Sequence, residues 1–124
     1  MFNKALSLPA DSLILDLEDS VTPQNKDSAR IEVCEWLCNA DFGGREKLVR
    51  MNPIDSAWGR TDLEAIIACK PDGIVVPKVL DSKSVNAVSE VIKSKEETYR
   101  KVVFYFLIFI STFGIHRIVS NILI

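Results

Sequence analysis

The sequence LILDLEDSV, Leu13 to Val21, is an apolar run that ends in three carboxylates, Asp16, Glu18 and Asp19. Its continuous apolar start is typical of a strand that is buried on both faces of a parallel sheet. A carboxylate in such a strand costs free energy unless it finds a partner. The stretch therefore predicts a buried strand whose carboxyl end forms part of a charged site.

Strand and helix patterns alternate on both sides of this stretch. Buried strands are expected at 13–17, 47–52, 73–79 and 102–110, and helices at 2–8, 23–39, 61–69 and 82–95. Thr22 is the expected cap of the second helix, and Thr61 with Glu64 forms an expected capping box for the third. Successive strands start roughly 30 residues apart, as in a strand, helix and crossover unit. The sequence thus predicts an α/β fold with a parallel sheet.

Two further strands also finish in polar residues. The second ends with Arg50 and Asn52, and the third ends with Lys78. Because the carboxyl ends of parallel strands converge on one face, these side chains are expected to lie near the carboxylates of the first strand. Spacing alone leaves two interpretations of equal weight, a structural ion-pair network and a ligand-binding site.

Composition sets limits on the class of protein. The 124 residues are enough for one domain, 48% of them are apolar, and the net charge of −2 gives no electrostatic case for nucleic acid. The three cysteines, Cys34, Cys38 and Cys69, include no C-x-x-C pair, so neither a disulfide framework nor a zinc site is indicated. Cys34 and Cys38 are expected as small buried side chains on an apolar helix stripe, and an intracellular, reducing location fits this usage.

The composition changes abruptly near residue 102. We divide the chain into a domain at 1–101 and an apolar segment at 102–124, which carries one Arg and one His. Three interpretations of the segment stay open: a buried strand with an irregular tail, a membrane anchor, and a non-native carboxyl terminus. The uncharged stretch before His116 is shorter than the roughly 20 residues that span a bilayer, which favours the strand.

The blocks ADSLILDLEDSVTPQNKDSAR, VRMN and PDGIVVPKV, in this order, resemble the HpcH/HpaI aldolase and citrate lyase family, in particular its citrate lyase β-subunit-like branch. The resemblance runs from about residue 1 to residue 101. It implies a partial TIM (β/α)8 barrel of the phosphoenolpyruvate/pyruvate-binding type, with about four βα units. It also implies a carbon–carbon lyase that uses Mg²⁺ and acts on a hydroxyacyl-CoA thioester such as citryl-CoA, malyl-CoA or citramalyl-CoA.

By this resemblance Arg50 is the active-site arginine. Its planar, permanently charged fork suits a carboxylate or an enolate oxygen. Alternation along a strand sends Asp16 and Glu18 to one side and Asp19 to the other, so the three carboxylates are not expected to share one role. We expect Glu18 and Asp19 at the catalytic site and Asp16 as a buried partner.

Three further cations are expected to bind the substrate. Lys26 and Arg30 match basic positions of the family that are expected to meet CoA phosphates, and Lys78 lies at the end of the third strand. Solvated helix charges are the alternative interpretation of Lys26 and Arg30.

The departures from the family pattern concern the metal. Members carry a Glu in an I-E-T/S-A block and an Asp on the next strand, whereas here the region reads FISTFGI, with Ser111 near the Glu position and no acidic residue after Glu97. We therefore expect no metal ligands in this chain and an inactive, truncated enzyme. The alternatives are a non-catalytic protein that docks on a full-length relative and a tail-anchored membrane protein. Family members form homo-oligomers, and a cytoplasmic or mitochondrial location is expected.

Overall fold

Four parallel strands form one sheet in the computed structural model, which describes residues 2–99 and 106–110. The strands pair in sequence order, as β1 (Ser12–Asp16), β2 (Glu46–Arg50), β3 (Gly73–Pro77) and β4 (Phe106–Ile110). Each strand is hydrogen-bonded to the next in parallel register. The predicted α/β fold with a parallel sheet is confirmed.

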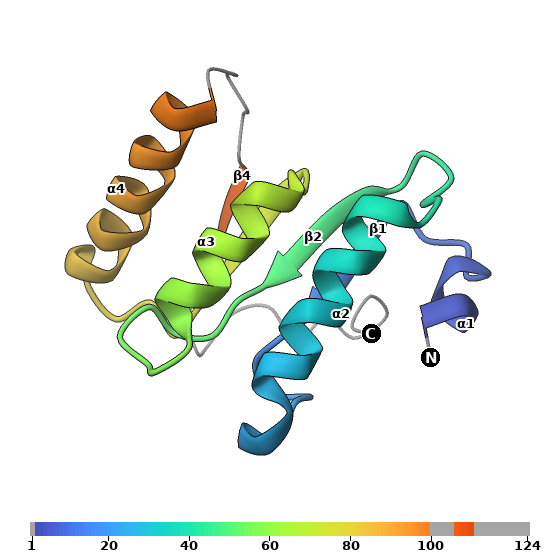
Figure 1. Cartoon of the computed structure of the whole chain (residues 1–124), viewed down its shortest axis with the longest axis horizontal. Coiled ribbons are helices and arrows are strands. Elements are labelled where there is room, and N and C mark those ends of the chain that lie inside the picture. Colours follow the sequence, from blue (N-terminus) through green and yellow to red (C-terminus); the bar gives the residue numbers. More distant parts are fainter. Residues whose placement is uncertain (1, 100–105, 111–124) are drawn as a thin grey trace.

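The long helices cover one face of this sheet (Figure 1). The helical elements are α1 (Phe2–Leu6), the short 3₁₀ helix η1 (Pro23–Asn25), α2 (Lys26–Asn39), α3 (Gly59–Cys69) and α4 (Ser82–Tyr99). α2 packs beside α3, and α3 beside α4. Parallel strands in sequence order with all crossover helices on one side are the arrangement of a (β/α)8 barrel, of which the described residues make three βα units and a fourth strand.

Side chains alternate between the two faces of the sheet. The helix-facing residues are the members of the main apolar core, which include Leu13, Leu15, Val49 and Ile74. The intervening residues of each strand point to the other face. Asp16 and Arg50, which are register partners, lie on that second face. In a closed barrel this face is the interior, where ligands reach the carboxyl ends of the strands.

One predicted helix start and one predicted capping hydrogen bond are wrong. α3 begins at Gly59, so Thr61 lies inside the helix and Glu64 pairs with Arg60 on the surface instead of closing a capping box. The Ser56 hydroxyl oxygen accepts a hydrogen bond from the Gly59 N–H at 3.1 Å, which satisfies one of the free amides of the first turn. Thr22 precedes η1, with Pro23 at the first position as expected, but its side chain makes no capping hydrogen bond.

The third strand ends two residues earlier than predicted. β3 stops at Pro77 because Lys78 adopts a left-handed backbone conformation with φ of 50°. The predicted strand at 102–110 is present as β4 from Phe106, while 102–105 and the rest of the apolar segment lie outside the described residues. No helix in the described part of the chain is long and apolar enough to cross a membrane.

The cysteines of α2 are less buried than expected. Cys34 is half-buried and Cys38 is exposed, whereas Val33 and Leu37 of the same helix lie in the core. The reason is the rotation of α2 about its axis. Val33 and Leu37 face the sheet, whereas Cys34 and Cys38 lie outside the core.

We predict a large packing defect for Gly59→Ala. A Cβ atom at Gly59 would lie 2.0 Å from the carbonyl oxygen of Pro53, and backbone on both sides would have to shift. The expected loss in the free energy of unfolding is about 2–3 kcal/mol, measured by urea denaturation. Gly44→Ala is the matched control, because its Cβ would contact nothing within 4 Å and only its φ of +79° opposes the change. Equal losses of unfolding free energy in Gly59→Ala and Gly44→Ala would contradict the predicted clash with Pro53.

Candidate active site

The site is built around an ion pair between neighbouring strands. Asp16 ends β1 and Arg50 ends β2, and the parallel register places them side by side. The Arg50 guanidinium donates two hydrogen bonds to the Asp16 carboxylate, from Nε to Oδ1 at 2.8 Å and from Nη2 to Oδ2 at 2.6 Å. Such a bidentate pair fixes the plane of the guanidinium as well as its position.

The carboxylate of Asp16 also organises the turn that follows β1. Its Oδ1 accepts the Glu18 N–H at 2.8 Å and its Oδ2 accepts the Ser20 N–H at 3.1 Å. Burial alone would raise the pKa of Asp16, but the hydrogen bonds from Arg50 and from the Glu18 amide outweigh it and hold the pKa below its usual value. The hydrogen bond to Asp16 in turn raises the pKa of Arg50. Both groups are therefore charged at neutral pH.

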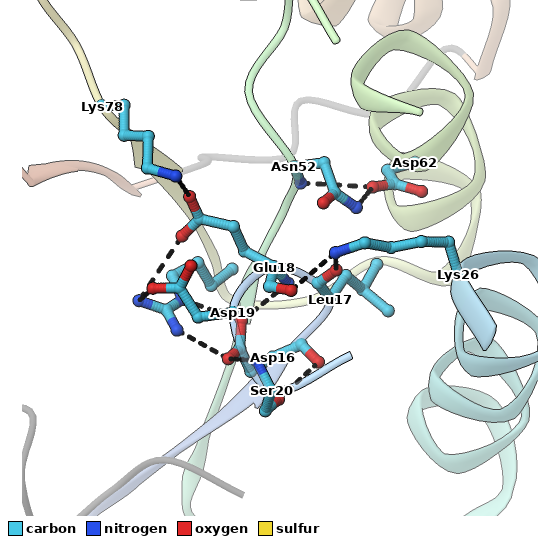
Figure 2. Close-up of polar contacts among 10 residues, drawn as sticks. Asp16, Leu17, Glu18, Asp19, Ser20, Lys26, Asn52, Asp62 and Lys78 are labelled. Carbon is cyan, nitrogen blue, oxygen red and sulfur yellow. Dashed lines mark hydrogen bonds and ion pairs between the residues drawn. The ribbon is translucent and has the colours of Figure 1, made fainter. Parts of the chain in front are cut away.

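Glu18 links the buried arginine to an exposed lysine. Its side chain is 6% exposed, with Oε2 3.5 Å from Arg50 Nη1 and Oε1 3.0 Å from Lys78 Nζ. The contact with Lys78 is an ion pair rather than a well-aligned hydrogen bond, since Oε1 has no partner at hydrogen-bonding angles. Glu18 raises the pKa of Lys78, whose side chain is 59% exposed. Figure 2 shows Glu18 between Asp16 and Lys78 in this group of charges.

Asp19 reaches the same guanidinium, which strand alternation does not predict. β1 ends at Asp16, and the following turn folds Asp19 back, so that its Oδ2 lies 3.7 Å from Arg50 Nη1. Its side chain is 67% exposed. Nη1 is thus the one nitrogen of Arg50 whose described contacts, to Glu18 and Asp19, are both long. A ligand carboxylate that displaced Asp19 would find this nitrogen available.

Lys26 stabilises the turn that follows β1. Its buried ammonium donates to the carbonyl oxygens of Leu17 at 2.8 Å and of Glu18 at 2.6 Å (Figure 2). The Trp58 ring lies under the same ammonium, with its centroid 5.6 Å from Nζ. These contacts give Lys26 a structural role between α2 and the turn. Its predicted contact with CoA phosphates stays a prediction.

A second buried network, around Asp62, has no counterpart in the sequence analysis. Asp62, in the first turn of α3, is fully buried and accepts hydrogen bonds from Arg30 Nη1 at 2.9 Å and from Asn52 Nδ2 at 2.6 Å. Arg30 also pairs with Asp27. Burial would lower the pKa of Arg30, but its two aspartate partners raise it. The predicted role of Arg30 toward CoA phosphates is likewise untested.

The structure therefore gathers most of the predicted site at one end of the sheet. Asp16, Glu18, Asp19, Arg50 and Lys78 form one cluster, whereas Lys26 and Arg30 are held by neighbouring protein groups. Asp62 gave no sequence signal, because an acidic residue in a first helical turn is common on exposed surfaces too.

The described residues do not fit a Mg²⁺ site. None of their His, Cys, Asp and Glu side chains form a group of three arranged to hold a metal ion. In addition, each carboxylate of the cluster already contacts Arg50 or Lys78. The metal of the predicted activity would need ligands from outside the described part of the chain.

A parallel sheet with a charged cluster at the carboxyl ends of its strands is typical of barrel enzymes that bind anionic substrates. The family model described as HpcH/HpaI aldolase/citrate lyase matches residues 1–121. The chain therefore belongs to the HpcH/HpaI aldolase/citrate lyase family, as the sequence blocks predict.

Individual relatives agree with this assignment. The chain is 43% identical over 89 residues to a (3S)-malyl-CoA thioesterase of Cereibacter sphaeroides, which covers 72% of this chain and 31% of the relative. It is 41% identical over 78 residues to the citrate lyase subunit beta of Escherichia coli, covering 63% of this chain and 26% of the relative. The crystal structure of RipC from Yersinia pestis shares the fold, with a TM-score of 0.59, 24% identity, and coverage of 84% of this chain and 41% of that one. The chain thus spans about a third of the length of the curated relatives it matches.

The lowered pKa of Asp16 predicts a specific pH dependence. A carboxylate whose pKa falls on folding stabilises the fold above its unfolded pKa, and this contribution is lost as the pH drops through the folded pKa. Between about pH 7 and about pH 3, Asp16→Asn should therefore lose less of its free energy of unfolding than the unmodified chain does. The measurement is urea denaturation at both pH values. Asp55→Asn, at an exposed site, is the control and should keep the original pH dependence.

Proposed function

We propose that this chain contributes the substrate-carboxylate site of a carbon–carbon lyase that acts on a hydroxyacyl-CoA thioester. The family and the relatives named for citrate lyase and malyl-CoA support a reaction on a CoA thioester. The observation that carries the proposal is the clamped Arg50: Asp16 binds two of its nitrogens and fixes its plane, and Nη1 is left facing the exposed Asp19.

The chemistry of such cleavage agrees with this geometry. Breaking the bond between the hydroxyl-bearing carbon and the α-carbon of the thioester leaves an enolate on the acyl-CoA fragment and a carbonyl on the other. Arg50, fixed and permanently charged, holds the carboxylate or the developing enolate oxygen. Asp19, exposed at the mouth, accepts the hydroxyl proton, and Glu18 keeps Arg50 and Lys78 in place. Lys78 offers a second cation to the anionic substrate.

Hydrolysis of the thioester is the second candidate. The specific observation in its favour is that the (3S)-malyl-CoA thioesterase is 43% identical, slightly above the citrate lyase subunit. Both reactions need a cation on the substrate carboxylate, so both use Arg50 alike. The products distinguish them: hydrolysis of malyl-CoA releases free CoA, whereas cleavage releases acetyl-CoA and glyoxylate.

An activity assay on a chimeric protein tests the proposed site. The matching segment of the Cereibacter sphaeroides relative is replaced by that of this chain, and turnover of malyl-CoA is measured in the complete barrel. We expect the chimera to be active. A correctly folded chimera without turnover would overturn the proposal that these residues form the substrate-carboxylate site.

The isolated chain is expected to be inactive. Residues 1–124 should not cleave citryl-CoA, malyl-CoA or citramalyl-CoA in the presence of Mg²⁺, because no acidic residue follows Glu97 to supply the family's metal ligands. Product analysis by mass spectrometry checks this. Turnover above background that disappears in Arg50→Ala would contradict it.

A further inference from the structure

The charged cluster at the strand ends has room for one ligand carboxylate but no cation for a second. Its side chains are three carboxylates, Asp16, Glu18 and Asp19, and two cations, Arg50 and Lys78. A first ligand carboxylate that displaces Asp19 binds Arg50 Nη1. A second ligand carboxylate would face an excess of negative charge, and like charges brought together oppose binding.

Lys78 can face a ligand only while it stays beside Glu18. Its ammonium lies 3.0 Å from Glu18 Oε1, and this oxygen is fully buried with no hydrogen-bond partner among the described residues. Moving Lys78 to a ligand would leave a buried carboxylate oxygen unpaired, and this cost exceeds the gain from an exposed ion pair. Lys26, which binds the same turn, is buried and donates to the carbonyl oxygens of Leu17 and Glu18.

The neighbouring strand β3 makes the other side of Arg50 apolar. Val75 is the register partner of Arg50, lies in the same row of the sheet and is fully buried. Pro77 is the next residue of β3 on this face, and it has no N–H group to donate to an anion. β4 continues these two rows with Ile108 and Ile110. A carboxylate on this side of Arg50 would lose its hydration without gaining a partner.

We propose that these residues select thioesters whose acyl part carries a single free carboxylate and reject the citryl thioester, whose acyl part carries two. The inference rests on the proposed function, in which Arg50 holds the substrate carboxylate. The candidate substrates differ at the carbon that bears the hydroxyl group, which carries hydrogen in malyl-CoA, methyl in citramalyl-CoA and carboxymethyl in citryl-CoA. Hydrogen and methyl fit the apolar side of Arg50 formed by Val75 and Pro77, whereas carboxymethyl needs a cation there.

The chimera with the Cereibacter sphaeroides relative tests this selection. We expect its kcat/KM for citryl-CoA to be at least about 100-fold below that for malyl-CoA, because like charges brought together have an effect of this size. Val75→Arg adds a cation beside Arg50 and should raise the ratio of citryl-CoA to malyl-CoA kcat/KM by at least about tenfold. Val75→Met is the matched control, since it lengthens the side chain without adding charge and should leave this ratio unchanged.

A second variant covers the risk that an arginine at this buried position prevents folding, which the urea midpoint of Val75→Arg reports. Asp19→Asn removes one negative charge at an exposed site and should raise the same ratio, although it slows both reactions. The inference alone would be overturned by comparable kcat/KM values for citryl-CoA and malyl-CoA, by a ratio that neither folded variant raises, or by an equal rise in Val75→Met. A folded chimera that is inactive on malyl-CoA, citramalyl-CoA and citryl-CoA would instead overturn the proposed function.

Discussion

Replacing Arg50 by Ala in the active chimera should lower kcat/KM for malyl-CoA by about 10²- to 10³-fold. Removal of one fixed group that stabilises developing negative charge has an effect of this size. Arg50→Lys should also lose at least about tenfold, because a single ammonium cannot bind Asp16 through two nitrogens and present a third to the substrate.

Two measurements separate a loss of chemistry from a loss of folding. Arg50→Ala leaves the buried Asp16 carboxylate without its cation, so the chimera's urea midpoint is measured beside its kinetics. Added guanidinium should restore part of the activity of Arg50→Ala, which a merely structural defect would not allow. Arg60→Ala is the matched control, since Arg60 is exposed and pairs only with Glu64 among the described residues. Activity of Arg50→Ala within tenfold of the parent chimera would contradict the role of Arg50.

Asp62→Ala should destabilise the chain by about 3–5 kcal/mol. Asp62 is fully buried and binds Arg30 on one side and Asn52 on the other. Its removal leaves a largely buried guanidinium with only Asp27, and the Asn52 amide groups without an acceptor. Breaking a buried ion pair by deleting one partner has a cost of this order.

Urea unfolding followed by tryptophan fluorescence measures this effect, because Trp58 lies in the loop before α3 and Trp36 stacks on Phe2. Asp55→Ala, at an exposed site in the same loop, should change the free energy of unfolding by no more than about 0.5 kcal/mol. Asp62→Asn keeps an acceptor for Asn52, so its loss in the free energy of unfolding should lie between those of Asp62→Ala and Asp55→Ala. A loss below about 1 kcal/mol in Asp62→Ala would show that this network contributes little.

The sequence predicts the sheet well because its strands are read from long-range patterns. Continuous apolar runs mark strands that are covered on both faces, and β1, β2 and β3 each lie within two residues of the predicted bounds. The convergence of Asp16, Arg50 and Lys78 then follows from parallel pairing alone.

Element ends are predicted less well, because they depend on local contacts that periodicity does not report. The pattern T-x-x-E at Thr61 is a capping box only if the helix starts there, and the Ser56 hydroxyl starts it two residues earlier. Alternation along a longer strand would send Asp19 to the opposite face from Asp16, but β1 stops at Asp16 and the following turn brings Asp19 to Arg50, within the site where it is expected. Such outcomes depend on where a strand stops, which hydrogen bonds to the Asp16 carboxylate decide.

The buried Lys26 ammonium has a consequence for the thermodynamics of ligand binding. It donates to the carbonyl groups of Leu17 and Glu18, while the Asp16 carboxylate accepts from the amides of Glu18 and Ser20. The turn that carries the carboxylates is therefore held in place by the chain's own side chains, and under the proposed function it would have little conformational entropy to lose on binding a thioester. Within the described cluster the side chains of Asp19 and Lys78 are exposed and keep rotamer freedom, so under the proposed function these two side chains would lose the most conformational entropy on binding an anionic substrate.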